Sequence, residues 1–224
     1  MSETEPRRRA PEGLSIRPED TRDHAAVRDL VARAFVEEPT VADLVSLLRH
    51  DSAGEEGHSY VAEIGGEVVG HVMMTRAWVD ALPRLVRVLV LSPLSVAPEW
   101  QSRGIGGSLV EYALAEAGGG DHPLVFLEGS PLYYTRFGFQ RASRLGFVAP
   151  SRRIPDPAFQ VVTLPAYEVW MTGSLVYPDV FWRLDAVGLR GEQLEEAGAA
   201  MGEGAEAAPG QRSPRGRGAR DPVG

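Results

Sequence analysis

A glycine-rich segment at residues 101–108 is the part of the sequence best suited to chemistry. It reads Gln-Ser-Arg-Gly-Ile-Gly-Gly-Ser, follows an apolar run that ends at Val96, and precedes a run with helical apolar spacing. This pattern predicts a strand, a tight turn and a helix. Glycines let successive backbone amides converge, and a helix start adds unpaired N–H groups and the positive end of its dipole. We expect the turn to bind phosphate oxygens.

Other interpretations of this segment fit less well. The phosphate loop of nucleoside triphosphatases needs a lysine, and the sequence contains none. Gly104-Ile105-Gly106 lacks the third glycine of a dinucleotide-binding turn. The remaining alternative is a tight turn that binds nothing. Gln101 and Arg103 in the turn, a Val-x-Pro before it and an apolar helix after it argue against that alternative.

Two segments resemble motifs of the GNAT acetyltransferases. Residues 101–106 are similar to motif A, Q/R-x-x-G-x-G/A, and residues 131–139, Pro-Leu-Tyr-Tyr-Thr-Arg-Phe-Gly-Phe, resemble motif B in the form typical of one bacterial branch. The resemblance covers most of residues 14–182. It implies an acyltransferase of the N-acetyltransferase type that uses acetyl-CoA as its cosubstrate. It also implies a homodimer as one arrangement of the chain.

The resemblance further implies where acetyl-CoA binds. The strand before the turn would contact the pantetheine arm and acetyl group, and the turn would hold the pyrophosphate. The expected cofactor-binding residues are Leu94, Ser95, Val96, Gln101, Ser102, Arg103, Gly104, Ile105, Gly106, Gly107 and Ser108. A backbone N–H at a strand bulge could stabilise the thioester oxygen, and Val96 is the candidate. We expect no metal, because the histidines have no metal-ligand spacing and cysteine is absent.

Acetyl transfer to an amine needs a base, since an alkylamine with a pKa of about 10.4 is protonated at neutral pH. Glu128, at the end of an apolar strand, is the candidate base. Glu37 and Glu38, in a loop between two helices, are alternatives, and each of these acids could equally be a solvated surface residue. Tyr134 matches the family's acid position beside the leaving thiolate, with a packing tyrosine as the alternative. His71 is expected to be a satisfied core or cleft histidine.

The expected reaction is acetyl transfer to a primary amine of a small molecule or peptide, by direct attack in a ternary complex. No cysteine is present to carry the acetyl group. A non-catalytic acyl-CoA sensor on the same fold is the alternative, and a partner-binding role for the acidic tail is a third. The acidic net charge favours a cationic acceptor.

The elements around these residues predict one mixed α/β (α+β) domain, and the resemblance implies that it has the GNAT fold. We expect a mostly antiparallel, twisted sheet of six to seven strands, flanked by about four helices. Pro93 should mark a bulge or an edge in its strand, and Gly65-Gly66 a hairpin turn. The expected strands are Leu14–Arg17, Ser59–Ile64, Val68–Val79, Val86–Val96, Leu124–Glu128, Gln140–Val148 and Phe159–Met171. The expected helices are Asp20–Phe35, one beginning at Thr40, Ser108–Ala117 and Pro131–Phe137.

Composition limits the remaining classes. The 224 residues carry a formal net charge of −8, which argues against a dedicated nucleic-acid binder. No apolar run approaches the roughly 20 residues of a membrane span, so we expect a cytoplasmic protein without a membrane partner. Residues 1–13 and 191–224 are expected to be disordered because their composition cannot support a core. The domain is expected to cover residues 14–190.

Overall fold

The computed structural model describes residues 10–51 and 58–189. The tails expected to be disordered, 1–13 and 191–224, lie outside the described residues except for residues 10–13. The described part forms one eight-stranded sheet with the order β1-β2-β3-β4-β5-β7-β6, and β8 pairs with β3. The strands are β1 (Leu14–Pro18), β2 (His58–Ile64), β3 (Glu67–Ala81), β4 (Leu85–Val96), β5 (Leu124–Glu128), β6 (Gln140–Arg141), β7 (Phe159–Thr163) and β8 (Gly173–Val176).

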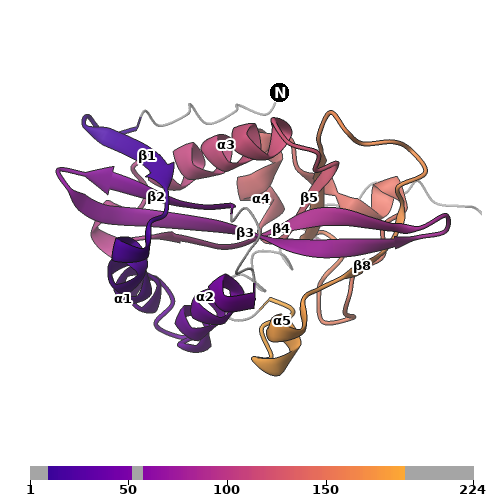
Figure 1. The fold of residues 1–224 in the computed structure, drawn as a ribbon, viewed down its shortest axis with the longest axis horizontal. Coiled ribbons are helices and arrows are strands. Elements are labelled where there is room, and N and C mark those ends of the chain that lie inside the picture. Colours follow the sequence, from indigo (N-terminus) through magenta and orange to yellow (C-terminus); the bar gives the residue numbers. More distant parts are fainter. Residues whose placement is uncertain (1–9, 52–57, 190–224) are drawn as a thin grey trace, which may run out of the picture.

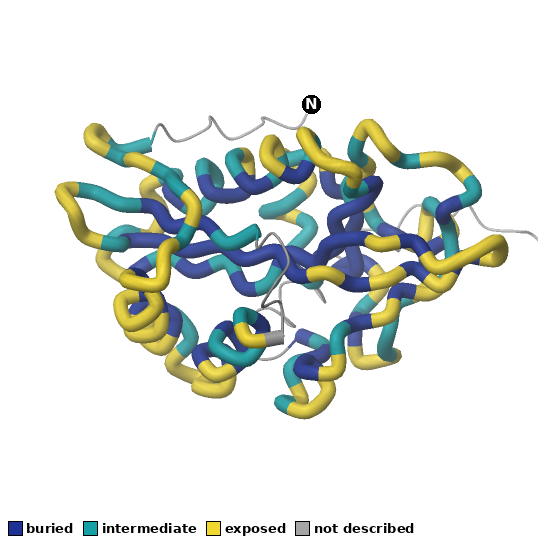
Figure 2. The backbone as a smooth tube through the Cα atoms, viewed as in Figure 1, coloured by how far each residue is buried: buried dark blue, intermediate teal, exposed yellow. Residues whose placement is uncertain are grey.

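Five α-helices among the described residues cover the two faces of the sheet (Figure 1). In that view α3 and α4 lie above the sheet, and α1, α2 and α5 lie below it. Figure 2 shows the buried backbone concentrated in the central strands and on the helix faces that contact them. The helices are α1 (His24–Ala34), α2 (Thr40–Asp51), α3 (Ile105–Gly118), α4 (Pro131–Tyr134) and α5 (Asp179–Arg183).

The apolar side chains of the helices explain which helix covers which face of the sheet. Side chains at helical spacing in α1 and α2 pack into one core layer below the sheet. Those of α3 form a second layer on the opposite face. The buried stripe residues are Val27, Leu30 and Val31 of α1, Val41, Leu44, Val45 and Leu48 of α2, and Leu109, Val110, Ala113 and Ala117 of α3.

The central strands β4 and β5 diverge after a short stretch of pairing. β3 and β4 form a long antiparallel pair, whereas β4 and β5 pair in parallel only at Leu89↔Val125 and Val90↔Phe126. Beyond Val90, β4 continues along β3 alone among the described strands. The β3–β4 register shifts between Val72 and Met74, so the Ser92–Pro93 part of β4 forms a bulge, as the proline predicts. The divergence opens the sheet between the ends of β4 and β5.

Several predicted elements differ from the structure. The strand expected over Gln140–Val148 ends at Arg141, because residues 142–145 form a 3-10 turn that ends at Gly146 with φ 82°. The strand expected over Phe159–Met171 ends at Thr163, just before Leu164-Pro165. The chain resumes as β8 only at Gly173. A Cβ on that glycine would lie 2.1 Å from the backbone oxygen of Asp80, so only glycine lets β8 approach β3 this closely.

The remaining predicted elements are confirmed with small changes in their bounds. The first helix of the sequence begins as a 3-10 turn at Thr21, capped by Asp20, before α1 proper. The helix α3 begins at Ile105, inside the segment predicted to be a turn, and not at Ser108. The sheet has one strand more than the largest number expected, and α5 adds to the expected helices. In the part of the chain that the structure describes, no helix is both long and apolar enough to cross a membrane.

Candidate active site

A cavity of about 420 Å³ lies where β4 and β5 diverge. Its walls come from elements that are distant in sequence. These are the α1–α2 linker (residues 35–39), the start of α2, the second half of β4, the end of β5, α4, Tyr177 with α5, and residues 185–189. Glu128 and Tyr134, the predicted base and acid, both line it. The divergence of the strands therefore creates a volume next to the predicted catalytic pair.

Glu128 is held in this cavity by a backbone contact from far along the chain. Its Oε2 accepts a hydrogen bond from the Gly188 N–H at 2.8 Å. Burial raises the pKa of the Glu128 carboxyl to about 7, although hydrogen bonds from Tyr177 and Gly188 offset part of that rise. A carboxyl that titrates near neutral pH can both accept and release a proton there. Glu128 thus has the properties of a general base.

Tyr134 faces the cavity from the short helix α4. Its ring packs on Gly129, where an added Cβ would lie 2.5 Å from Cε2 of the ring, and it contacts Phe139 edge-on. Burial raises the pKa of the Tyr134 hydroxyl well above its usual range. The hydroxyl therefore stays protonated at neutral pH and can donate a hydrogen bond.

The glycine-rich turn has the geometry of an anion site. Ser102 (φ 57°) and Gly104 (φ 86°) both have left-handed backbone conformations, and Gly104 is the N-cap of α3. The first hydrogen bond of the helix runs from Ser108 N–H to the Gly104 carbonyl at 3.0 Å. Helix geometry leaves the N–H groups of the three residues between them without a partner inside the helix. Gln101 anchors the turn by donating to the Val96 carbonyl at 3.2 Å.

Of the predicted cofactor-binding residues, only Leu94 also lines the cavity. The residues from Gln101 to Ser108 lie at the start of α3, on the other face of the sheet. Leu94 and Val96 pack on the α3 side, whereas Ser95 is 2% exposed and pairs with His71. Val96 pairs with Gly70 in regular register, so the bulge expected near it lies earlier in β4, at Ser92–Pro93.

A family model described as "Acetyltransferase (GNAT) domain" matches residues 15–142. The chain belongs to the GNAT acetyltransferase family. The uncharacterized N-acetyltransferase YjhQ of Escherichia coli (strain K12) is 31% identical over 160 residues, which cover 70% of this chain and 87% of YjhQ. The resemblance in the sequence is thereby confirmed at the level of the family.

Solved structures support the same GNAT fold. The E. coli GNAT protein YhbS, in complex with CoA, has a TM-score of 0.70 and 27% identity. The match covers 85% of this chain and all of the YhbS chain (100%). A GNAT acetyltransferase of Brucella melitensis, in complex with acetyl-CoA, has a TM-score of 0.60 and 28% identity, over 75% of this chain and 97% of the other. The mixed sheet expected from the sequence is thus the GNAT sheet.

The two adjacent tyrosines of this GNAT domain face opposite sides. A Cβ on Gly106 would lie 2.8 Å from the Tyr133 hydroxyl, so Tyr133 reaches the first turn of α3 while Tyr134 faces the cavity. Arg136 stacks on the Tyr133 ring at 4.1 Å and on Phe137 at 4.9 Å. The Arg136 side chain is exposed, and its guanidinium lies on the aromatic rings that border the glycine-rich turn.

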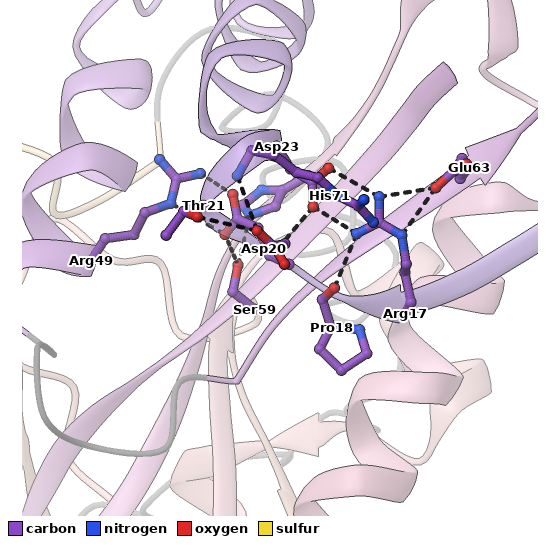
Figure 3. A network of polar contacts seen from close by, with 11 residues as sticks. Arg17, Pro18, Asp20, Thr21, Asp23, Arg49, Ser59, Glu63 and His71 are labelled. Atoms are coloured by element: carbon purple, nitrogen blue, oxygen red, sulfur yellow. Dashed lines mark hydrogen bonds and ion pairs between the residues drawn. The ribbon is translucent and has the colours of Figure 1, made fainter. Parts of the chain in front are cut away.

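A buried polar network fixes the α1–α2 side of the GNAT fold (Figure 3). Glu19, which follows β1, is bonded to Arg49 of α2 and accepts from Ser59 of β2. Burial alone would raise the Glu19 pKa, but His71, Arg49 and Ser59 lower it to about 2. His71 is fully buried, with Nε2 3.0 Å from Ser59 Oγ. None of these network residues lines the cavity, so His71 is a core histidine, but it is not fully satisfied as expected, because its buried Nδ1 has no hydrogen-bond partner among the described residues.

No group of three or more His, Cys, Asp or Glu side chains that could hold a metal occurs among the described residues.

The sequence analysis missed two residues that contact Glu128, namely Tyr177 and Gly188. The only sequence signal for them was a late Val-Tyr-Pro element at residues 176–178. Nothing local to Glu128 indicated that a segment so far along the chain would pack against it.

Proposed function

We propose that this GNAT chain transfers an acetyl group from acetyl-CoA to a primary amine of a small molecule or peptide. The observation that carries the proposal is the cavity at the divergence of β4 and β5, lined by both Glu128 and Tyr134. A base whose pKa is near neutral and a protonated hydroxyl then face one volume. The complexes of the similar E. coli and Brucella proteins with CoA and acetyl-CoA support the choice of cosubstrate.

The chain's own groups fit acetyl-CoA in two places. The unpaired N–H groups at the start of α3 suit the pyrophosphate, and the β4 backbone from Leu94 to Val96 suits the pantetheine arm. A side chain at residue 106 would clash with the Tyr133 hydroxyl, so the site at the start of α3 has little spare volume. When bound there, acetyl-CoA supplies an activated acetyl thioester.

Glu128 and Tyr134 would then divide the proton chemistry. Glu128 takes a proton from the acceptor ammonium, and the amine nitrogen bonds to the acetyl carbon as the carbon–sulfur bond breaks. The second proton that the nitrogen then loses goes to the thiolate, which leaves as the free thiol. Tyr134 donates a hydrogen bond to the departing sulfur. A thiol has a pKa near 8.5 and burial raises the Tyr134 pKa far above that value. Full transfer of the tyrosine proton is therefore uphill, and stabilisation of the thiolate by hydrogen bonding is the expected role.

Two measurements test this proposal. Calorimetric titration of acetyl-CoA into the native protein should show binding. Gly106→Val should abolish it, because the valine side chain would occupy the space proposed for the pyrophosphate at the start of α3. Thiol release with a panel of amines should depend on Glu128, and Glu128→Gln should lower kcat/KM about 10²- to 10⁴-fold. Absence of acetyl-CoA binding by the folded native protein would overturn the proposal. Binding without thiol release from any amine would leave the acyl-CoA sensor as the function.

A further inference from the structure

The charge of the cavity wall indicates a narrower class of acceptor than membership of the GNAT family does. Its acidic lining residues are Glu37, Glu38, Glu128 and Asp185, and no Arg, Lys or His is among the lining residues. We infer that the acceptor is an alkyl diamine or polyamine, with one amine at Glu128 and a second cation at the α1–α2 linker. The inference rests on the proposed acetyltransferase function.

The linker acids are the first reason for a second cation. Elsewhere in the described structure, acidic side chains are commonly ion-paired to arginine, as in Asp23 with Arg17 and Glu99 with Arg33. Asp185 of the cavity wall is likewise paired, with Arg153. The side chains of Glu37 and Glu38 have no ion-pair or hydrogen-bond partner among the described residues. Two unpaired carboxylates at a cavity wall attract a cation from the ligand.

The positions of the acids are the second reason. Glu128 ends β5, whereas Glu37 and Glu38 belong to the α1–α2 linker, so the acids lie on different walls of the cavity. Glu128 is engaged by Gly188 and by Tyr177 within the wall. Glu128 acts on the reacting amine, so Glu37 and Glu38 of the linker are available to bind a second cationic group of the acceptor.

Part of the cavity wall is apolar, which suits the methylene chain of a diamine. The cavity is also lined by aliphatic and aromatic side chains, including Phe35, Val41, Leu44, Phe181 and Leu189. The volume of about 420 Å³ falls within the range of roughly 300–1,000 Å³ for small-molecule sites. An acceptor with a carboxylate would place a negative charge against the linker acids and is disfavoured.

The test compares amines that have the same chain length and differ only in the group at the end opposite the reacting amine. Thiol release is measured with 1,5-diaminopentane, pentylamine and 6-aminohexanoate at fixed acetyl-CoA. The expected kcat/KM for the diamine is at least about tenfold above that of the monoamine, with the amino acid the poorest acceptor. The Glu37→Gln/Glu38→Gln variant should bring the ratio of diamine to monoamine toward one, mainly by raising KM for the diamine. Glu67→Gln, at the exposed start of β3, is the matched control and should keep the native ratio.

The outcomes separate this inference from the proposed function. Equal kcat/KM for the diamine and the monoamine, or a native ratio in the double variant, would overturn the diamine inference and leave acetyl transfer intact. Preferential acetylation of a lysine-containing peptide over every free diamine would also overturn it. Absence of thiol release with all amines would overturn both.

Discussion

The carboxyl of Glu128 and the backbone N–H of Gly188 form a 2.8 Å hydrogen bond across a sequence separation of 60 residues. Gly188 has φ 94°, and a Cβ there would lie 2.8 Å from the Cβ of Arg153, so the position requires glycine. Tyr177 supplies a second hydrogen bond to the same carboxyl. The predicted base is therefore oriented by a segment that the GNAT motifs do not include.

Removal of the Tyr177 hydroxyl should change the pH dependence of catalysis. This hydroxyl stabilises the charged form of Glu128, so Tyr177→Phe should raise the Glu128 pKa further above about 7. The acid limb of the kcat/KM profile should move upward by about one pH unit, in line with a hydrogen bond to a charged group of about 1.5 kcal/mol. Tyr112→Phe on α3 is the control. A purely structural role would lower activity without moving the limb.

Glu128 should also affect how stability varies with pH. Its pKa is raised from 4.5 to about 7 in the folded protein. The folded state then holds its proton to higher pH than the unfolded chain does. That contribution to stability is complete below pH 4.5 and is lost as pH rises through 7. Glu128→Gln should therefore gain melting temperature relative to the native protein between pH 5 and pH 9. A constant difference over that range would contradict the raised pKa.

Tyr134→Phe tests the role of the hydroxyl at the leaving sulfur. The ring packing on Gly129 should survive, so stability and acetyl-CoA affinity should change little. We expect kcat to fall by about 10²-fold, at the lower end of the range for such groups, because only hydrogen bonding to the sulfur is lost. Single-turnover kinetics beside calorimetric Kd would separate the two quantities. Loss of affinity with kcat preserved would instead indicate a packing tyrosine.

Arg136 offers a test of the proposed phosphate site at the start of α3. Its guanidinium stacks on Tyr133, whose hydroxyl reaches Gly106 at the start of α3. Arg136→Ala should weaken acetyl-CoA binding by up to about tenfold, and the difference should shrink at high salt. Arg144→Ala, an exposed arginine in the turn after β6, is the matched control. If both variants bind acetyl-CoA with the affinity of the native protein, Arg136 does not contribute to the phosphate site.

A histidine pair predicts sensitivity to acid. The Nε2 atoms of His58 and His122 are 3.2 Å apart, and His58 Nδ1 is 3.2 Å from the Tyr60 hydroxyl. Burial, the charge of His58 and that of Arg87 lower the His122 pKa to about 4, while Asp121 acts in the opposite direction. The unfolded chain thus binds its proton first, so stability should fall as pH drops from 6.5 to 4. His122→Gln should flatten that fall in melting temperature, and the exposed His24→Gln should not.

The predictions from the sequence succeeded where local pattern decides structure. The helices α1 and α2, the Gly65-Gly66 hairpin and the helix after the glycine-rich turn all depend on residues within a few positions of one another. They failed around β6 to β8. Phe147 is buried, yet it lies in a turn and not in a strand, because Gly146 and the preceding 3-10 turn redirect the chain. An apolar residue indicates burial, not the backbone conformation that achieves it.

The sequence by itself determined the family, the glycine-rich turn before α3 and the tyrosine at residue 134, because these depend on residue types at fixed local spacing. Only the tertiary structure decided that Glu128 lies beside Tyr177 and Gly188, and that the α1–α2 linker adds its acids to the same cavity. The early end of the β4–β5 ladder creates that cavity. Burial within it then sets the Glu128 pKa. Neither the path of distant backbone segments nor the loss of solvent around a carboxyl is recorded in local sequence spacing.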